Sequence, residues 1–273
     1  MIRIVFVLLC AAAFSRSIFG QSVKDDLGKS FDKFSVVKIN NREALRKADS
    51  GAPFEIQTNE KTFRFILKPN DIRSADYRAE YTDNDGRHNL PRGEVFTYQG
   101  TIVGEPHSLV ALTVDGTTTE GYFATASEGF FIESAKKYSA SAGSDDKVIY
   151  RVEDKAIRDD NIYSLDEDMA QAMKSESSNS NFNIADSPQI GQRRVLKVAT
   201  EADKEFVLEP ITGDGDPAKA NAHILSVMNQ VDAVYRRDLN LRVVVTFQHA
   251  WMPGAVDPYA GLSNSVCESI VEN

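Results

Sequence analysis

Few residues of this 273-residue chain could do chemistry, and its four histidines are the first to consider. They are His88, His107, His223 and His249. Hydrolytic zinc sites commonly place two histidines one helical turn apart, with a glutamate directly after the first as general base. None of the four is followed by glutamate, and no two are four positions apart. The sequence therefore predicts no catalytic residue, no metal ligand and no cofactor-binding residue in this chain.

Other polar groups also lack the spacing of a reactive site. Adjacent acid pairs such as Asp25–Asp26 are typical of solvated loops. The segment Thr212–Lys219 resembles a calcium loop, but it lacks the acid that an EF-hand carries at its twelfth position. Asp216 followed by proline indicates a capped helix start there. His249 lies close to Trp251 and is either a site residue or, more commonly at a strand end, a partly buried and hydrogen-bonded one.

The N-terminus has the layout of a secretory signal peptide. A positive charge at Arg3 precedes a short apolar run over residues 4–14, and the small residue Gly20 stands before Gln21. We therefore predict a signal over residues 1–20, cleavage at Gly20–Gln21, and secretion. The alternative is a buried N-terminal strand or helix.

Charge and cysteine content restrict the partners. A net charge of −9 argues against nucleic acid, because phosphate binding requires a basic surface. No apolar stretch is long enough to span a membrane. With Cys10 in the signal, Cys267 is the single cysteine left, and it is either a buried free thiol or paired with sequence that this chain does not contain.

Residues 21–158 carry short alternating strands separated by turns. Asp83–Gly86 is a hairpin-type turn, and strands are expected over residues 94–103, 108–114 and 121–125. Even spacing with glycine at the turns indicates an antiparallel β-meander domain, built as a sandwich or as an open curled sheet.

Residues 159–194 differ in composition from what precedes them. Acids cluster over residues 159–168, and "KSESSNSN" (174–181) is polar and of low complexity. Such a segment buries too little apolar surface to offset chain entropy, so we expect an exposed linker. Arg193 and Arg194 at its end form a candidate processing site, although two adjacent arginines also occur by chance.

Residues 195–273 change pattern again. A short strand over 195–199 is followed by a helix from Asp216 and a strand in "LNLRVVVTF", which together predict a parallel β-α-β unit. The helix carries an apolar stripe that we expect to be core: Ile224, Val227, Met228, Val231, Val234, Tyr235 and Leu239. The predicted fold is thus multi-domain, with an antiparallel β-meander domain followed by an incomplete α/β segment. Because the rest of its sheet is missing, Val243–Val245 and the stripe are expected to be uncovered. Residues 195–273 are then expected to be poorly protected from hydrogen exchange, while the meander is protected.

Two parts of the sequence resemble reprolysin-like (adamalysin-type) zinc metallopeptidases. The segments "KVATEADKEF" (197–206), "ANAHILSVMNQVDAVYRRDLNLRVVV" (220–245) and "QHAW" (248–251) are similar to the start of their metzincin catalytic domain. The run "YQGTIVGEPHSLVALTVDGTTTEGYFATASEGFFIES" (98–134) is similar to the propeptide that precedes it.

The resemblance implies a secreted zinc metalloendopeptidase precursor that acts on proteins or peptides. Zinc is the cofactor of the complete family member, held by an H-E-x-x-H-x-x-G-x-x-H motif that this chain lacks, so the chain alone is expected to be inactive. The propeptide is expected to assist folding and keep the enzyme latent; residues 21–192 hold no cysteine, so latency would be steric. The resemblance also places a disulfide partner of Cys267 downstream. The alternative function is a secreted non-catalytic binding or inhibitory protein built on the β domain.

Overall fold

The computed structural model describes residues 22–156 and 194–256. The predicted signal with Gly20 and Gln21, the linker with Arg193, and Cys267 lie outside the described residues. The signal and processing predictions therefore stay predictions.

The first described region forms an eight-stranded sheet in which all neighbouring strands are antiparallel. Its order is β1-β10-β9-β8-β7-β6-β3-β2. The strands are β1 (Ser35–Lys38), β2 (Phe54–Gln57), β3 (Thr62–Pro69), β6 (Thr97–Ile102), β7 (Leu109–Val114), β8 (Thr119–Ala124), β9 (Gly129–Ser134) and β10 (Asp146–Arg151). The predicted antiparallel meander is confirmed.

The sheet curls around helix α2 (Asn41–Ser50), an element that the sequence pattern did not predict. Asn40 caps this helix by accepting from Glu43 N, and Gly51 ends it with a positive φ of 67°. The two outer strands approach each other, since the backbone N–H of Asn59 donates to Ser35 Oγ at 3.1 Å. Of the two predicted forms, the structure is the open curled sheet.

A second sheet of four strands has the order β11-β12-β4-β5. Its strands are β4 (Arg73–Asp83), β5 (Gly86–Leu90), β11 (Arg194–Ala202) and β12 (Leu241–Trp251). β11 and β12 are parallel, as predicted, and are joined through helix α5 (Pro217–Asp238). β4 pairs with β12, also parallel, and β5 returns antiparallel along β4. The hairpin at Asp83–Gly86 therefore belongs to this second sheet, although it comes from the N-terminal part of the chain.

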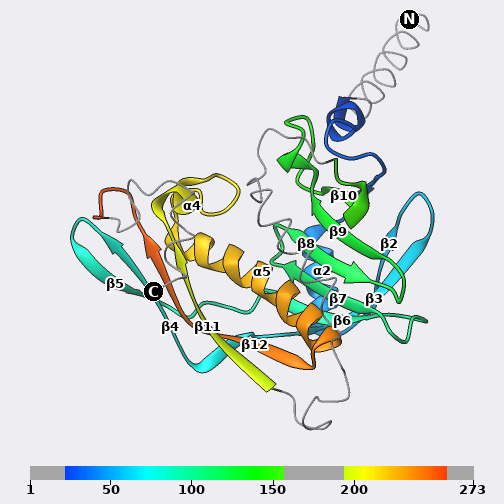
Figure 1. The fold of residues 1–273 in the computed structure, drawn as a ribbon. Coiled ribbons are helices and arrows are strands. Elements are labelled where there is room, and N and C mark those ends of the chain that lie inside the picture. The colour runs from blue at the N-terminus through cyan, green and yellow to red at the C-terminus, as the bar shows by residue number, and fades with distance from the viewer. Residues whose placement is uncertain (1–21, 157–193, 257–273) are drawn as a thin grey trace, which may run out of the picture.

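This pairing overturns the expectation that Val243–Val245 are uncovered. The three valines are at most 9% exposed, because β4 completes the sheet beside β12 and α5 covers one face. Helix α5 lies between the two sheets and contacts both (Figure 1). Further helical segments are residues 22–27 at the start of the described chain, α4 (Lys204–Leu208), η1 (Ala135–Lys137) and η2 (Val152–Asp154).

The apolar stripe of α5 is not its most buried face, so that prediction was wrong. Val227 is 46% exposed and Leu239 63%. The residues of the helix that are buried are small or polar: Ala220, Asn221, Asn229, Asp232 and Ala233. The reason is that the face of the large sheet turned to α5 carries polar side chains such as Gln99 and Thr113, which a purely apolar helix face would leave unpaired.

Asp232 joins α5 to both sheets and is fully buried. Its Oδ1 accepts from the backbone N–H of Val243 on β12 at 2.8 Å, and its Oδ2 accepts from Gln99 Nε2 on β6 at 2.9 Å. Arg236 Nε lies 2.8 Å from Oδ2, one turn further along the helix. A buried carboxylate is tolerated because each of its oxygens is paired.

Asn229, one turn before Asp232, makes a second buried connection to the large sheet. Its Nδ2 donates to the carbonyl oxygens of Tyr98 and Leu112 at 3.1 and 3.4 Å, and its Oδ1 accepts from Asn70 Nδ2 at 2.9 Å. Asn229 and Asp232 form directional hydrogen bonds to specific atoms of the sheets. These bonds therefore set the position of the helix along the large sheet more strictly than apolar packing would.

We predict that Asp232→Ala lowers the free energy of unfolding by about 2–4 kcal/mol, because it leaves Arg236, Gln99 and a backbone N–H without their partner. Urea unfolding followed by the fluorescence of the single tryptophan measures this. Asp238→Ala on the same helix is the matched control: its ion pair with Arg237 is exposed, so the loss should stay below about 1 kcal/mol. Equal effects of the two substitutions would contradict the assignment.

Candidate functional site

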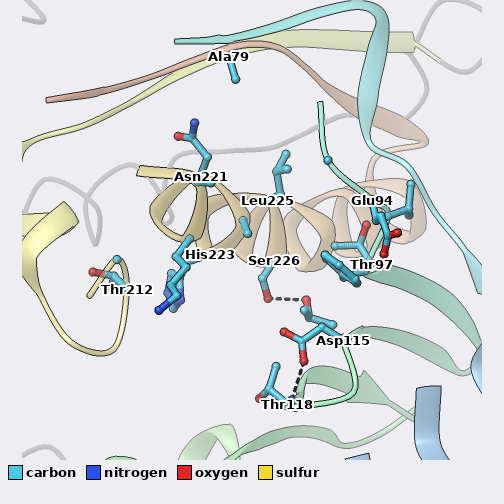
Figure 2. Close-up of a pocket in the computed structure, with 18 of the residues that line it drawn as sticks. Ala79, Glu94, Thr97, Asp115, Thr118, Thr212, Asn221, His223, Leu225 and Ser226 are labelled. Carbon is cyan, nitrogen blue, oxygen red and sulfur yellow. Dashed lines mark hydrogen bonds between the residues drawn. The ribbon is translucent and has the colours of Figure 1, made fainter. Parts of the chain in front are cut away.

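A cavity of about 440 Å³ lies where the second sheet, the large sheet and α5 meet. Residues 90–97, which run from β5 back to the large sheet, form one wall, and β6–β8 form the floor. The loop before α5 and the first turns of that helix form the third side (Figure 2). The cavity therefore exists only where the N-terminal and C-terminal parts of the chain come together.

The helix that enters this cavity starts as predicted. Asp216 Oδ1 accepts from Ala218 N at 2.8 Å and from Lys219 N at 3.4 Å, and Pro217 occupies the first helical position. The segment Thr212–Lys219 is thus a capped helix start. Gly213 is required in this loop because a Cβ there would clash with the carbonyl oxygen of Val207 in α4.

His223 is the histidine that lines the cavity. Its ring packs edge-on against Phe206, with ring centroids 5.8 Å apart. Burial lowers the pKa of His223, and the nearby Lys137 ammonium lowers it further, while Glu120 and Glu133 oppose this. The imidazole is therefore held neutral at neutral pH. Figure 2 shows it directed toward Thr212.

The charged groups of the cavity floor neutralise one another. Lys137 Nζ lies 2.6 Å from Glu120 Oε2 and 3.5 Å from Glu133 Oε1. Burial lowers the pKa of Lys137, but the two carboxylates more than offset this and raise it. Nearby, Thr113 Oγ1 donates to Ser226 Oγ at 2.6 Å, so this serine is hydrogen-bonded to a threonine and not to a base (Figure 2).

The opposite wall is also charge-paired. Asp71 accepts from Arg73 Nε at 2.8 Å and from Arg92 Nη2 at 3.0 Å. Burial acts to raise the pKa of Asp71, but these guanidinium hydrogen bonds lower it below its usual value. The Tyr77 hydroxyl donates to Gln248 Oε1 at 2.7 Å, and burial raises the pKa of Tyr77 to about 12. None of these groups is poised for nucleophilic or acid–base chemistry.

His249 lies elsewhere, at the carboxyl ends of the parallel strands. Its Nε2 is 2.9 Å from Thr82 Oγ1 on β4 and its Nδ1 is 3.1 Å from Glu201 Oε1 on β11. Trp251 Nε1 also donates to Glu201 Oε1, at 2.6 Å. The order hydroxyl, imidazole, carboxylate resembles a hydrolytic triad, but His249 is only 3% exposed and leaves no room for a substrate. Of the two predicted roles, the structure confirms the buried, hydrogen-bonded one, which ties three strands together.

The remaining two histidines lie apart from these sites. His88 Nε2 is 2.9 Å from Asp83 Oδ1 and its ring stacks on Tyr81 at 4.8 Å. His107 is exposed on the turn between β6 and β7. Within residues 22–156 and 194–256, no group of three or more His, Cys, Asp or Glu residues could hold a metal ion.

The residues that carry the sequence resemblance have structural tasks here. Gly100 lies where a Cβ would clash with the carbonyl oxygen of Ile66 on β3. Ser108 Oγ accepts from the backbone N–H of Ile102 at 2.8 Å and so closes the turn after β6. Asn229 and Asp232, which lie in the resembling segment 220–245, are the buried connections described above. The sequence pattern flagged these positions without showing what they contact.

Of the candidate processing pair, the structure describes Arg194 alone. It is exposed, begins β11 and pairs in register with Leu241. Cleavage after this pair would fall just inside a strand of the second sheet.

Comparison with known proteins gives one relationship. The chain is 24% identical over 215 residues to a Xenopus laevis protein described as "Disintegrin and metalloproteinase domain-containing protein 22". The similarity covers 73% of this chain and 22% of that relative, so the chain spans about a fifth of the relative's length. No family model matches the chain. Among the described residues, no helix is both long enough and apolar enough to cross a membrane.

We predict that His223→Gln reduces the loss of stability on acidification. The folded-state pKa of His223 is depressed below its ordinary value of 6.5, so the unfolded chain binds the proton first. Stability that is present above about pH 6.5 is therefore lost as pH falls through the folded-state value. Urea midpoints at about pH 7.5 and pH 5 measure this, with His107→Gln on its exposed turn as control. An unchanged pH dependence in the His223 variant would show that this histidine is not responsible.

Proposed function

We propose that this chain is the propeptide and the first part of the catalytic domain of a secreted zinc metalloendopeptidase precursor. The similarity to a metalloproteinase-related protein and the order of the two resembling segments, 98–134 before 197–251, support this. Protein or peptide substrates and zinc belong to the complete protein. No residue of this chain is assigned as a zinc ligand or as the general base.

Within that precursor, the N-terminal part acts as an intramolecular folding partner of the segment that follows. The observation that carries this proposal is the parallel pairing of β4 with β12. Without β4, the edge of β12 would expose a row of backbone hydrogen-bonding groups, which favours aggregation. The large sheet in turn supplies Gln99 and the Tyr98 carbonyl to the buried polar residues of α5. The C-terminal segment therefore depends on the N-terminal part for both its sheet and its helix.

The alternative, a binding or inhibitory protein built on the β domain alone, requires that domain to stand without the C-terminal segment. The interlocked strands argue against it, because removing residues 194–256 would leave the β4–β5 hairpin without its second sheet. An isolated two-stranded hairpin is only marginally stable in water.

The decisive experiment cuts the linker of the otherwise intact chain. A recognition site for a sequence-specific protease is inserted within residues 174–181, and the cut and uncut proteins are compared by size-exclusion chromatography and circular dichroism. We expect the two fragments to elute together and to separate only where urea unfolds them. Fragments that separate in native buffer, with the β part still folded, would overturn the folding-partner role and favour the alternative.

We also predict that the purified 273-residue chain does not hydrolyse casein in a zinc-dependent manner, because its histidines lack the spacing of a zinc site. A known zinc endopeptidase serves as positive control. Cleavage that 1,10-phenanthroline abolishes and added zinc restores would refute this expectation.

A further inference from the structure

Asn221 is the unexplained polar group of the cavity between the two sheets. It lies in the first turns of α5, lines the cavity and is 4% exposed. Within residues 22–156 and 194–256, its side-chain Nδ2 and Oδ1 both lack a hydrogen-bond partner. Its backbone is satisfied, since the carbonyl oxygen accepts from Gln248 Nε2 at 3.2 Å. A buried amide with neither donor nor acceptor paired is costly, so a partner beyond the described residues is expected.

The unpaired amide of Asn221 is an exception among the buried polar residues of α5. Asn229 and Asp232 on the same helix are at least as buried, and both are hydrogen-bonded through their side-chain atoms. Asn221 differs because it lines the cavity, where no described group reaches its amide. Figure 2 shows its amide directed to the side where Ala79 of β4 lies.

The surroundings of Asn221 restrict the chemistry of that partner. Ala79 and Leu225 lie on the same side of the helix, and Ile72 and Leu90 also line the cavity, so the body of a ligand would meet apolar side chains. The charged groups described above, Glu120 with Lys137 and Asp71 with two arginines, are already paired. The carboxylates of Glu94 and Asp115 also line the cavity and would repel an anionic ligand, whereas an uncharged ligand disturbs neither them nor the pairs.

We propose that this cavity binds a small uncharged ligand with an apolar body and a carboxamide, or a similar edge that places one donor next to one acceptor. Such an edge pairs with Asn221 twice, by donating to Oδ1 and accepting from Nδ2. A volume of about 440 Å³ lies within the range of small-molecule sites in proteins. The proposal does not rest on the protease precursor assignment, because it follows from the cavity alone.

Benzamide is the test probe, because it combines an apolar ring with one carboxamide. We expect its titration into the full chain to shift the Asn221 side-chain NH₂ resonances in heteronuclear NMR spectra in a saturable manner, with a dissociation constant on the order of millimolar for a ligand of this size. Benzoate, which carries a charge in place of the amide, should not produce this shift. Absence of a saturable benzamide shift, or an equal benzoate shift, would overturn the proposal.

Asn221→Leu keeps the side-chain size and removes the amide. We expect it to weaken benzamide binding by about tenfold to a hundredfold, through loss of two neutral hydrogen bonds. Its urea midpoint should equal or exceed that of the native chain, because an unpaired buried amide is replaced by an apolar group. Asn59→Leu, on a turn away from the cavity, is the control and should leave binding unchanged. Unchanged binding in the Asn221 variant, or a clearly lowered midpoint, would show that the amide serves the fold and not a ligand.

Discussion

A single buried carboxylate determines how the two sheets are held together. Asp232 cannot stay charged and buried unless its oxygens are paired, and its partners come from α5, from β6 in the large sheet and from β12 in the second sheet. The contacts with Gln99 and with the N–H of Val243 fix the helix relative to both sheets, and Arg236 on the helix itself adds its charge. The polar interface of α5 buries less apolar surface than an apolar face would, but it fixes the orientation of the helix. The cavity lies beside the helix in that orientation.

The second constraint is that a parallel strand pair needs neighbours on its edge and its faces. β11 and β12 alone would leave Val243–Val245 uncovered, and the chain solves this with strands taken from more than a hundred residues upstream. β4 pairs with β12 with Val245 opposite Arg73, so the N-terminal and C-terminal parts share one sheet in addition to being joined by the linker. An N-terminal part that contributes strands to the sheet of the following segment affects how that segment folds.

Most of the polar side chains discussed above are paired with other groups of the described chain. Around the cavity, Glu120 pairs with Lys137 and Asp71 with Arg73, and Ser226 bonds to a threonine. His249 has a triad-like set of neighbours, yet its ring is buried and only 3% exposed. Asn221 stands apart from this pattern, since its buried side-chain amide has no hydrogen-bond partner among the described residues.

The sequence by itself determined the elements whose signal is local: the antiparallel meander, the cap at Asp216, the long helix and the parallel strands on either side of it. It also indicated that His249 is buried, and that Thr212–Lys219 is a helix start. Helix α2 was missed because its few apolar residues lie among charged ones in "NREALRKADS". Only the tertiary structure decided which sheet the β4–β5 hairpin joins, because an alternating strand has the same local pattern in either sheet. The apolar stripe of α5 was also misassigned as its buried face, because the polar groups of the large sheet that face the helix cannot be read from the helix sequence. Burial of Asn221, Asn229 and Asp232 depends on partners far away in the chain, and helical periodicity carries no information about those partners.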